Sequence, residues 1–387
     1  MRYSFVAAAG AVLILACDAS SPLAPVGSIL EARSANAAGS VPTISVMTRN
    51  VYPGTDLDAV IAALANGDPS DDIPALVLAY QVLRHTDWPT RAGAIADEIA
   101  RAGPMVVGLQ EVSEFDLDFS ALYPDFVPVL IDYQVDFLPI LMEELADRGL
   151  AYSPISITNI DVDVAPAPIV TARFVDHDVL LIRDDLAPTA VGGANFTACL
   201  GPAPCLGGVP FTLKRGFVYA SISVLGEDVM FVSAHPESGR SVDVASVRAL
   251  QVAELLGWIG AYATGPVILM GDLNEAPDVD LVPGVPGVYE MLMAAGFTDV
   301  WASLRPGASG YTCCHDADLS DIVPSGFDER IDYLLTRGLG RSGPGLQGQI
   351  GIVGLRPSAR VMGPEGLIWP SDHAGVVGQL RFPRFDD

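Results

Sequence analysis

The sequence is poor in basic residues. Its 387 residues include 21 lysines and arginines against 47 aspartates and glutamates, which gives a formal net charge of −26 at pH 7. Proteins that bind nucleic acid without help depend on basic contacts to phosphate, so this composition disfavours nucleic acid as a partner. The acidity also fits plain solubility, or life in a salty or metal-rich medium, and charge alone identifies no chemistry.

The N-terminal apolar run is too short to span a membrane. Residues 5–16 are apolar and precede Cys17 and a stretch rich in Ser, Pro and Ala. A run of this length cannot cross a bilayer, and its position has the pattern of an export signal. We predict an export signal over residues 1–17, a flexible tether over 18–40 and one domain over 41–387.

Cys17 stands in a context that resembles a bacterial lipobox. It directly follows Ile14, Leu15 and Ala16. In such a motif the cysteine is lipidated and becomes the first residue of the mature chain. Leu15 is a less usual choice before Ala16, so simple secretion stays open as the alternative. Either way we expect an extracytoplasmic domain, anchored to the membrane through its N-terminal lipid if Cys17 is modified.

Cysteine is scarce, with five in the whole chain. Four remain when Cys17 is set aside: Cys199, Cys205, Cys313 and Cys314. An even number in an oxidising compartment indicates disulfides, and the Gly/Pro loop CLGPAPC favours a bond between Cys199 and Cys205. A bond between the adjacent Cys313 and Cys314 would be strained. A zinc site built from those two thiolates and His315 is a rival, although the usual gap between cysteine ligands is missing.

The pattern of apolar residues predicts a mixed fold. Half of the residues are hydrophobic, so a sizeable core is expected. Predicted strands cover residues 43–48, 105–109, 178–182, 217–222, 229–233, 267–270 and 331–335, and predicted helices cover 87–102, 134–148, 241–262 and 287–295. Strands and helices do not alternate strictly, which favours an α+β sandwich of two sheets flanked by helices. The Pro/Gly-rich stretches 164–170 and 338–366 are predicted to be surface loops.

Polar residues collect where the predicted strands end. They are Asn50, Gln110, Glu111, His235, Asp272 and Asn274. One such residue is normally a cap or a turn former, but so many, together with Asp332, Asp372 and His373, predict a site on one rim of a sheet. Oxygen ligands favour a hard cation such as Mg²⁺, which often also binds substrate phosphate; Mn²⁺ and Ca²⁺ are alternatives.

Six motifs then resemble one known family. In chain order they are TRNV (48–51), GLQEV (108–112), SAHPES (233–238), GDLNEAP (271–277), ERIDYLL (329–335) and SDH (371–373). They resemble the endonuclease/exonuclease/phosphatase superfamily, which includes DNase I, abasic-site endonucleases, bacterial sphingomyelinases and inositol-polyphosphate 5-phosphatases. The resemblance covers residues 43 to about 382 and implies a DNase I-like, four-layer sandwich of two packed mixed β-sheets flanked by helices. It also implies metal-dependent cleavage of a phosphate ester, without naming the substrate.

The resemblance implies a role for each acidic or amide residue of the motifs. Glu111 would be the central metal ligand, with Asn50 near the metal and phosphate and Asp372 as a further acidic partner. Asp272 would orient the attacking water or the leaving group, and Asn274 would donate a hydrogen bond to the charge that develops on the phosphoryl oxygens.

The resemblance likewise implies two catalytic histidines. His373 would be the general base, oriented by Asp332, and His235 would face it across the phosphate as an acid or a stabiliser. Residues without motif support are predicted to be structural: His85, His177 and His315. Arg215 and Arg330 either contact phosphate or pair with surface acids, and we expect Glu275 to be exposed rather than catalytic.

Departures from the family pattern bear on the substrate. The first motif lacks the Trp that many relatives carry before the Asn, and Tyr52 stands where abasic-site endonucleases have an Asp, which weakens a DNA-repair function. We expect residues 52–89 and 312–321 to lie near the rim and to select the substrate. The acids Asp316, Asp318 and Asp321 form either a solvated loop or a Ca²⁺ site.

Together these features predict an exported, membrane-tethered, Mg²⁺-dependent phosphodiesterase or phosphatase that uses a water activated by a His–Asp pair. Its phosphoester substrate is either a lipid head group or scavenged nucleic acid. No exposed aromatic hairpin for entering membranes is evident in the sequence, and neither is an obligate protein partner. The alternative is a catalytically silent surface module that kept the fold; the presence of every motif residue speaks against it.

Overall fold

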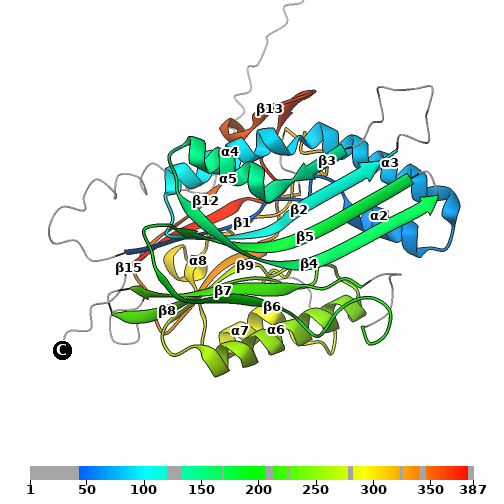
Figure 1. Ribbon diagram of the computed structural model, residues 1–387. Helices are drawn as coiled ribbons and strands as arrows, with labels where there is room; N and C mark the ends of the chain where they lie inside the picture. The colour runs from blue at the N-terminus through cyan, green and yellow to red at the C-terminus, as the bar shows by residue number, and fades with distance from the viewer. Residues whose placement is uncertain are drawn as a thin grey trace, which may run out of the picture.

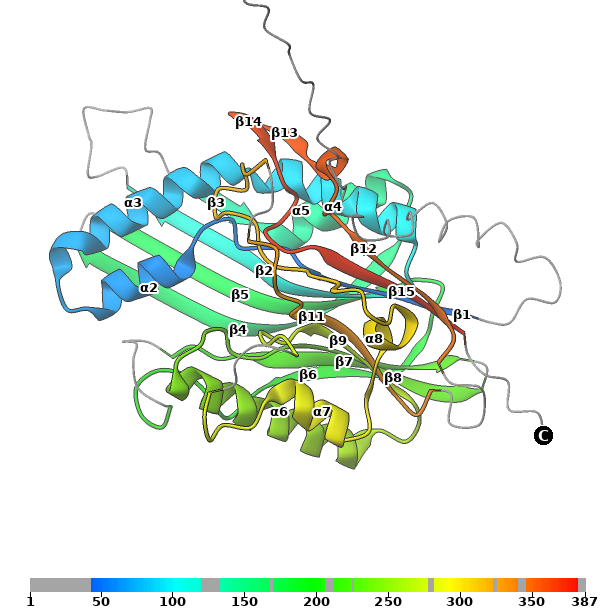
Figure 2. The ribbon, with the colours of Figure 1, turned by 180° about the vertical axis from the view of Figure 1, so that it is seen from behind.

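The computed structural model describes residues 43–119, 133–167, 170–205, 212–224, 226–277, 282–322, 326–339 and 346–381. Figures 1 and 2 show two β-sheets packed face to face, with helices on both outer faces. The predicted α+β sandwich with four layers is therefore confirmed. The predicted export signal, the tether and the lipidation site Cys17 lie outside the described residues.

The first sheet is mixed. Its described strands are β1 (Thr43–Asn50), β2 (Val106–Asp118), β3 (Tyr133–Asp136), β4 (Tyr152–Ala167), β5 (Val170–Arg183), β12 (Gly348–Val353) and β15 (Gly375–Arg381). Their order is β12-β15-β1-β2-β5-β4, and β3 pairs with β2. β1 and β2 are parallel, so Asn50 at the end of β1 lies beside Gln110 of β2, which Glu111 follows directly.

The second sheet is also mixed. Its described strands are β6 (Pro188–Asn195), β7 (Gly216–Val224), β8 (Glu227–His235), β9 (Val267–Asp272), β10 (Thr298–Asp299) and β11 (Asp332–Arg337), in the order β10-β11-β9-β8-β7-β6. The parallel pair β8–β9 carries His235 and Asp272 to one rim, and the antiparallel register sets Asp332 opposite Asp272. A small hairpin, β13 (Val361–Gly363) with β14 (Gly366–Ile368), stands apart from both sheets.

The two sheets meet closely beside the site. Buried apolar side chains such as Val46, Phe231 and Met270 fill the space between them. At Gly108, two residues before the polar end of β2, a Cβ atom would lie 2.7 Å from Ser233 Oγ and 2.9 Å from Met270 Cγ. Glycine at this position therefore lets β2 approach the second sheet and brings the two polar rims together.

Helices cover the outer faces. The first sheet carries α2 (Leu57–Ala65), α3 (Pro69–Thr86), α4 (Trp88–Ala102) and α5 (Phe137–Asp147), and the second carries α6 (Val242–Tyr262) and α7 (Val288–Ala294). Two short helices, α8 (Val300–Leu304) and η2 (Pro357–Ala359), complete the described elements. By length and composition alone α6 could cross a membrane, but Val252, Leu255 and Ile259 are buried against the second sheet, as in an ordinary core helix.

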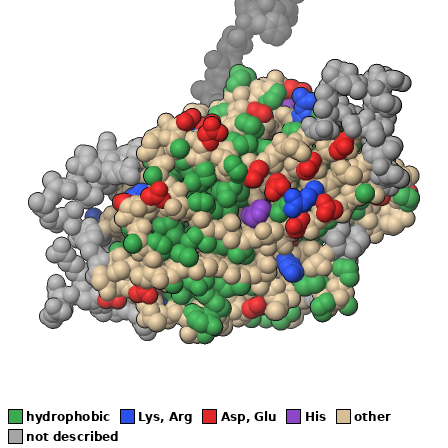
Figure 3. Space-filling view, viewed as in Figure 1, with side chains coloured by type: hydrophobic (Ala, Val, Ile, Leu, Met, Phe, Trp, Pro, Cys, Tyr) green, Lys and Arg blue, Asp and Glu red, His purple; other side chains and the backbone are tan. Residues whose placement is uncertain are grey.

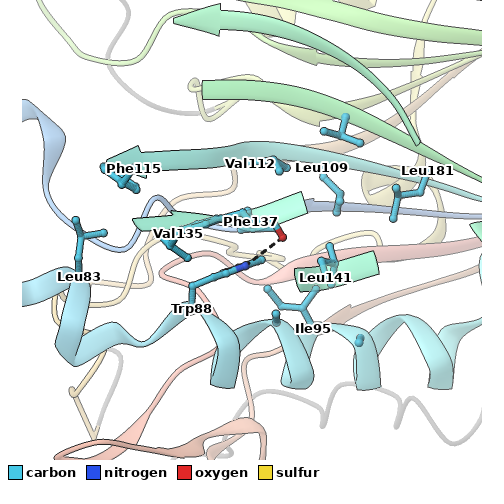
Figure 4. Packing of buried hydrophobic residues seen from close by; sticks show 14 of the residues in the cluster. Leu83, Trp88, Ile95, Leu109, Val112, Phe115, Val135, Phe137, Leu141 and Leu181 are labelled. Atoms are coloured by element: carbon cyan, nitrogen blue, oxygen red, sulfur yellow. Dashed lines mark hydrogen bonds between the residues drawn. The ribbon is translucent and has the colours of Figure 1, made fainter. Parts of the chain in front are cut away.

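The packing of α4 shows why the first outer layer forms. Trp88, Ile95 and Ile99 lie on one face at helical spacing and are buried. Figure 4 shows Trp88 stacked on Phe137 of α5. The ring centroids are 4.0 Å apart, and Trp88 Nε1 donates a hydrogen bond to the Phe137 carbonyl oxygen at 3.1 Å. This contact fixes the two helices against the apolar face of β2.

The predicted strands and helices are all present, although β2 continues to Asp118 and β5 begins at Val170, far beyond the predicted 105–109 and 178–182; two predicted loops are wrong. Within residues 164–170, β4 continues to Ala167, which pairs with Val170 of β5, so the described part is strand rather than surface loop. β4 is at the edge of its sheet, where proline removes no hydrogen bond to a neighbouring strand. Residues 338–366 include β12, whose register with β15 runs from Gly348 to Val353. The many glycines in this segment concealed that strand.

The cysteines pair in a way that the sequence predicts in part. Cys199 and Cys205 are joined, with Cα atoms 4.9 Å apart, as expected. Cys313 and Cys314 are also joined, across a cis peptide bond, a pairing disfavoured from the sequence as strained. Their sulfur atoms lie near His373 rather than His315, which does not match the zinc site considered from sequence.

Candidate active site

The motif residues from both sheets converge on one buried site. β1 supplies Asn50, β2 supplies Glu111, β8 supplies His235, β9 supplies Asp272 and β11 supplies Asp332. Asn274 follows β9, and Asp372 and His373 precede β15. Asn50, His235, Asp272, Asp332 and His373 are buried, although all of them are polar or charged. Buried charges persist when they have partners, so the contacts among these groups define the site.

His373 is held by a carboxylate. Its Nδ1 lies 2.8 Å from Asp332 Oδ2. The backbone N–H of Asp332 donates to Thr312 Oγ1 at 3.2 Å, which fixes the acid in turn. Burial lowers the pKa of His373, but the charges of Asp332, Asp372 and Asp272 outweigh it and raise the pKa well above the usual value. Nε2 is therefore the ring nitrogen that is oriented toward the rest of the site.

Asp272 lies between the two histidines. Its Oδ2 is 3.8 Å from Nε2 of His373 and 3.8 Å from Nε2 of His235. Asn50 Nδ2 donates to the same oxygen at 3.1 Å, and the backbone N–H of Asn274 donates to Oδ1 at 2.9 Å. Burial, helped by the charge of Asp332, raises the pKa of Asp272 to about 6. The carboxylate is thus fixed in place and equidistant from both imidazoles.

Glu111 is presented by a bulge in β2. The pairing of β2 with β5 shifts register between Leu109 and Val112, and Glu111 has a left-handed backbone with φ of 61°. Asn274 is also left-handed, with φ of 54°. Such conformations cost about 1–3 kcal/mol in a residue other than glycine and are concentrated at functional sites. The bulge turns the Glu111 side chain out of the regular strand alternation.

Glu111 and Asp372 form an acidic pair. Burial, and then the charge of Asp372, raises the pKa of Glu111 to about 8, and burial also raises the pKa of Asp372. Two close carboxylates with few cationic partners repel one another, and a divalent cation relieves this repulsion. Their oxygen donors therefore fit the predicted hard-metal site. Asn50 is less free to be a ligand, because its Oδ1 accepts from the Tyr52 N–H at 2.9 Å and its Nδ2 is bonded to Asp272.

A second group of potential ligand atoms belongs to the catalytic contacts instead. Asp272, Asp332 and His373 place one ligand atom each within 4.8 Å of one another. His373 Nδ1 is already bonded to Asp332, and Asp272 already accepts two hydrogen bonds. We therefore interpret this group as the hydrogen-bonded base and its partners, and Glu111 with Asp372 as the metal ligands.

His235 has partners that sequence reasoning missed. Its Nδ1 lies 3.2 Å from Arg215 Nη1 and 3.7 Å from Asp178 Oδ1. Because the guanidinium can only donate, Nδ1 is the acceptor and the proton resides on Nε2. Burial, and then the charge of Arg215, lowers the pKa of His235 well below the usual value, so the ring stays neutral. The neutral N–H is directed toward Glu111 and Asp272, at 3.9 and 3.8 Å.

Buried acids hold Arg215 in place. Its Nε lies 3.4 Å from Glu237 Oε1 and its Nη1 lies 3.9 Å from Asp176 Oδ2. Asp176 and Asp178 lie on either side of His177 inside β5, in the sequence VDHDVLL, and both are buried. Their spacing resembles the polar half of an alternating strand, so no separate sequence signal marks this layer. Arg215 therefore pairs with acids, which is one of the two alternatives expected from the sequence, although these acids are buried rather than on the surface.

Other residues considered from sequence lie outside the cluster. Arg330 pairs with Asp299 at 2.8 Å. His85 contacts Glu365, His177 contacts the Val112 carbonyl oxygen, and His315 contacts Asp321. The expected exposure of Glu275 is wrong. Its side chain is only 10% exposed, because it packs 3.6 Å from Arg248 Nε and accepts from the backbone N–H of Tyr289.

The two predicted substrate-selecting segments have different positions. The loop 312–321 supports the site, because the His315 N–H donates to the Asp372 carbonyl oxygen and the Ala374 N–H donates to the Thr312 carbonyl oxygen. In the segment 52–89, Tyr52 lies beside the acids, but α2 and α3 pack on the first core cluster. Asp318 accepts from Ser320 and Asp321 from His315, contacts typical of a loop that is hydrogen-bonded within itself.

Comparisons with known proteins agree with this geometry. The family described as "Endonuclease/Exonuclease/phosphatase family" matches residues 81–373. A protein of that family from Beutenbergia cavernae superimposes with a TM-score of 0.54 at 21% identity, over 88% of this chain and 72% of that chain. One from Bacteroides thetaiotaomicron gives 0.53 at 16% identity, over 89% and 100%. A mannosyl-6-phosphatase from the same organism gives 0.51 at 18% identity, over 88% and 100%. No curated protein matches the sequence. At these identities the structural likeness shows the fold alone.

Proposed function

The chain belongs to the endonuclease/exonuclease/phosphatase family, and from this premise we propose that it hydrolyses phosphate esters with the help of a divalent cation, Mg²⁺ by preference. The observation that carries the proposal is the placement of Asp272 at 3.8 Å from Nε2 of both His235 and His373. A phosphate held beside this carboxylate would have one imidazole on each side. The acids Glu111 and Asp372, which would hold the cation, belong to the same cluster and are partly buried.

In the proposed reaction His373 Nε2 takes a proton from the attacking water. The water oxygen bonds to phosphorus, the bond from phosphorus to the leaving oxygen breaks, and that oxygen takes up a proton from solvent. Asp332 orients the base and stabilises its charged form. Glu111 and Asp372 would hold a cation, which would supply Lewis-acid polarisation of a phosphoryl oxygen and positive charge near the acids around His373.

His235 acts in this proposal as a neutral hydrogen-bond donor. Arg215 occupies its Nδ1 and burial keeps its pKa low, so the Nε2–H is available to the phosphoryl oxygens. Asn274 is a second donor near the same place. Its backbone N–H is bonded to Asp272, and one hydrogen of its Nδ2 is bonded to the Pro236 carbonyl oxygen at 3.0 Å, which leaves the other Nδ2 hydrogen for a phosphoryl oxygen. Donors fixed in advance stabilise developing charge without reorganisation. The role of stabiliser thus fits His235 better than that of acid.

Export and membrane tethering belong to the same proposal. Their support is the apolar run ending at Cys17 in a lipobox-like context. The sequence is compatible with two classes of substrate, a lipid head group and a nucleic acid. The face in Figure 3 carries acidic side chains among few basic ones, and its described residues form no continuous basic area. This surface and the net charge of −26 do not favour long DNA or RNA.

The proposal is tested by assaying phosphoester release from sphingomyelin, plasmid DNA and an inositol phosphate, each with Mg²⁺ or with EDTA. The variant His373→Ala removes the base, and His85→Ala is the control because that histidine lies outside the cluster. We expect EDTA-sensitive release from at least one substrate, lost in His373→Ala and kept in His85→Ala. Release that survives EDTA, or that survives loss of His373, would contradict the mechanism.

A further inference from the structure

A hollow opens directly beside the candidate catalytic residue Asn274. Its volume is about 290 Å³, and Asn274 is part of its wall. The same residue is bonded to Asp272 and Pro236, so the hollow adjoins the point where a phosphate would be held. The remaining wall comes from the segment after β8, the first turns of α6, the segment after β9 and the residues before β11. A group esterified to the phosphate would enter this space.

The charged side chains that line the hollow sum to zero net charge. Two arginines and two glutamates line it: Arg240, Arg248, Glu275 and Glu329. Arg240 and Glu329 form an ion pair at the mouth, where Arg240 is 73% exposed. Deeper in, Arg248 Nε lies 3.6 Å from Glu275 Oε2, beyond hydrogen-bond distance, and makes no hydrogen bond within the described part of the chain. A ligand with hydroxyl groups would satisfy such donors and acceptors.

Apolar side chains also line the hollow: Ala245, Val282 and Val285. A sugar ring has the matching chemistry, because its C–H face packs on apolar side chains while its hydroxyls bond to carboxylates and guanidiniums. The volume also matches. At roughly 30 Å³ for each water-sized group, 290 Å³ holds about ten such groups, close to the size of a single sugar ring.

We infer that this hollow binds the organic group of the substrate, and that the group is one uncharged, polyhydroxylated ring of the size of a monosaccharide. The inference rests on the proposed function and narrows its substrate class. The hollow offers no excess of positive charge for the additional phosphates of a nucleic acid strand. A fatty acyl chain would cover the charged side chains of the lining and could not hydrogen-bond to them.

The test compares two phosphomonoesters, a hexose 6-phosphate and p-nitrophenyl phosphate, by kcat/KM with the full chain and Mg²⁺. Glu329→Gln and Arg240→Ala change the mouth of the hollow, and Arg101→Ala, on the last turn of α4, is the control. We expect the ratio of kcat/KM for the sugar phosphate to that for p-nitrophenyl phosphate to fall about tenfold in each mouth variant, mainly through KM, because a charge-assisted hydrogen bond is lost. The Arg101→Ala ratio should match the wild type.

A third variant guards against misfolding of the first two. Val285 lines the hollow, so the larger side chain of Val285→Trp would fill part of it. This variant should raise KM for the sugar phosphate more than for p-nitrophenyl phosphate. Hydrolysis of p-nitrophenyl phosphate with an unchanged ratio in all three variants would overturn the inference and leave the proposed function intact. Preference of the wild type for DNA or a phospholipid over the sugar phosphate would overturn it as well. Hydrolysis of no phosphoester would refute the proposed function itself.

Discussion

Replacing Asp332 by Asn should reduce turnover while leaving the fold in place. Asp332 is 2% exposed, and its Oδ2 lies 2.8 Å from His373 Nδ1. The substitution keeps the size of the side chain but removes the charge that orients and stabilises the protonated base. General-base catalysis contributes about 10²–10⁴-fold, so we expect kcat to fall at least about a hundredfold, equivalent to about 2.7 kcal/mol in the barrier.

The pH dependence distinguishes this role from a structural one. The charge of Asp332 is the first of the three that raise the pKa of His373. Removing it lowers that pKa. Because the base works in its neutral form, the pH at which activity rises should move to a lower value in Asp332→Asn, even though the maximal rate is smaller. The assay is kcat/KM for a chromogenic phosphoester across pH 5–9.

The control is a second carboxylate–imidazole pair in the same protein. His315 Nδ1 lies 2.9 Å from Asp321 Oδ2, outside the candidate active site. Asp321→Asn should therefore leave both the rate and the pH profile close to those of the wild type. If Asp332→Asn kept more than a tenth of the wild-type rate with an unmoved profile, the assignment of Asp332 and His373 as an oriented base would be refuted.

Three further predictions concern stability and metal binding. Arg49 Nε lies 3.2 Å from the Glu98 carboxylate, so Glu98→Ala leaves a buried guanidinium without its partner. The free energy of unfolding in urea should fall by about 3–5 kcal/mol, and a fall of less than about 1 kcal/mol would show that the pair is not needed. Cys199→Ser opens the short loop closed with Cys205 and should lower the free energy of unfolding by about 2 kcal/mol relative to oxidised wild type, while reduced wild type should unfold like the variant. Glu111→Gln should weaken Mg²⁺ binding in calorimetry at least about tenfold, and equal affinity would remove Glu111 from the ligand set.

Much of the fold follows from local patterns that tertiary structure does not override. Short β-branched runs such as Val267–Asp272 are buried on both faces, and periodic segments such as Trp88–Ala102 pack one apolar face. β12 escaped detection because its glycines weaken the strand signal, and its pairing with β15 depends on a partner far along the chain. The last residues of β4 escaped detection because prolines are acceptable only at a sheet edge, and the sequence does not reveal which strand is the edge.

The convergence of the site was predictable because its residues stand at strand ends. Parallel pairing of β1 with β2 and of β8 with β9 brings those ends to one rim. The sequence could not show the buried group that contacts His235, which consists of Arg215, Asp176 and Asp178. Asp178 lies in the middle of β5, where an acid looks like the polar half of an alternating strand. The bulge that presents Glu111, and the burial of Glu275, also depend on packing that no local pattern encodes.

The central claim is that the strand-end cluster hydrolyses phosphate esters through His373 and a cation held by Glu111 and Asp372. The most direct measurement is the rate of bis(p-nitrophenyl) phosphate and p-nitrophenyl phosphate hydrolysis by wild type and His373→Ala, after EDTA treatment and again after adding Mg²⁺. The account predicts that EDTA abolishes the wild-type rate on at least one ester, that Mg²⁺ restores it, and that the folded variant stays at least about a hundredfold slower throughout. A folded His373→Ala protein as fast as wild type, or a wild-type rate indifferent to EDTA, would contradict it.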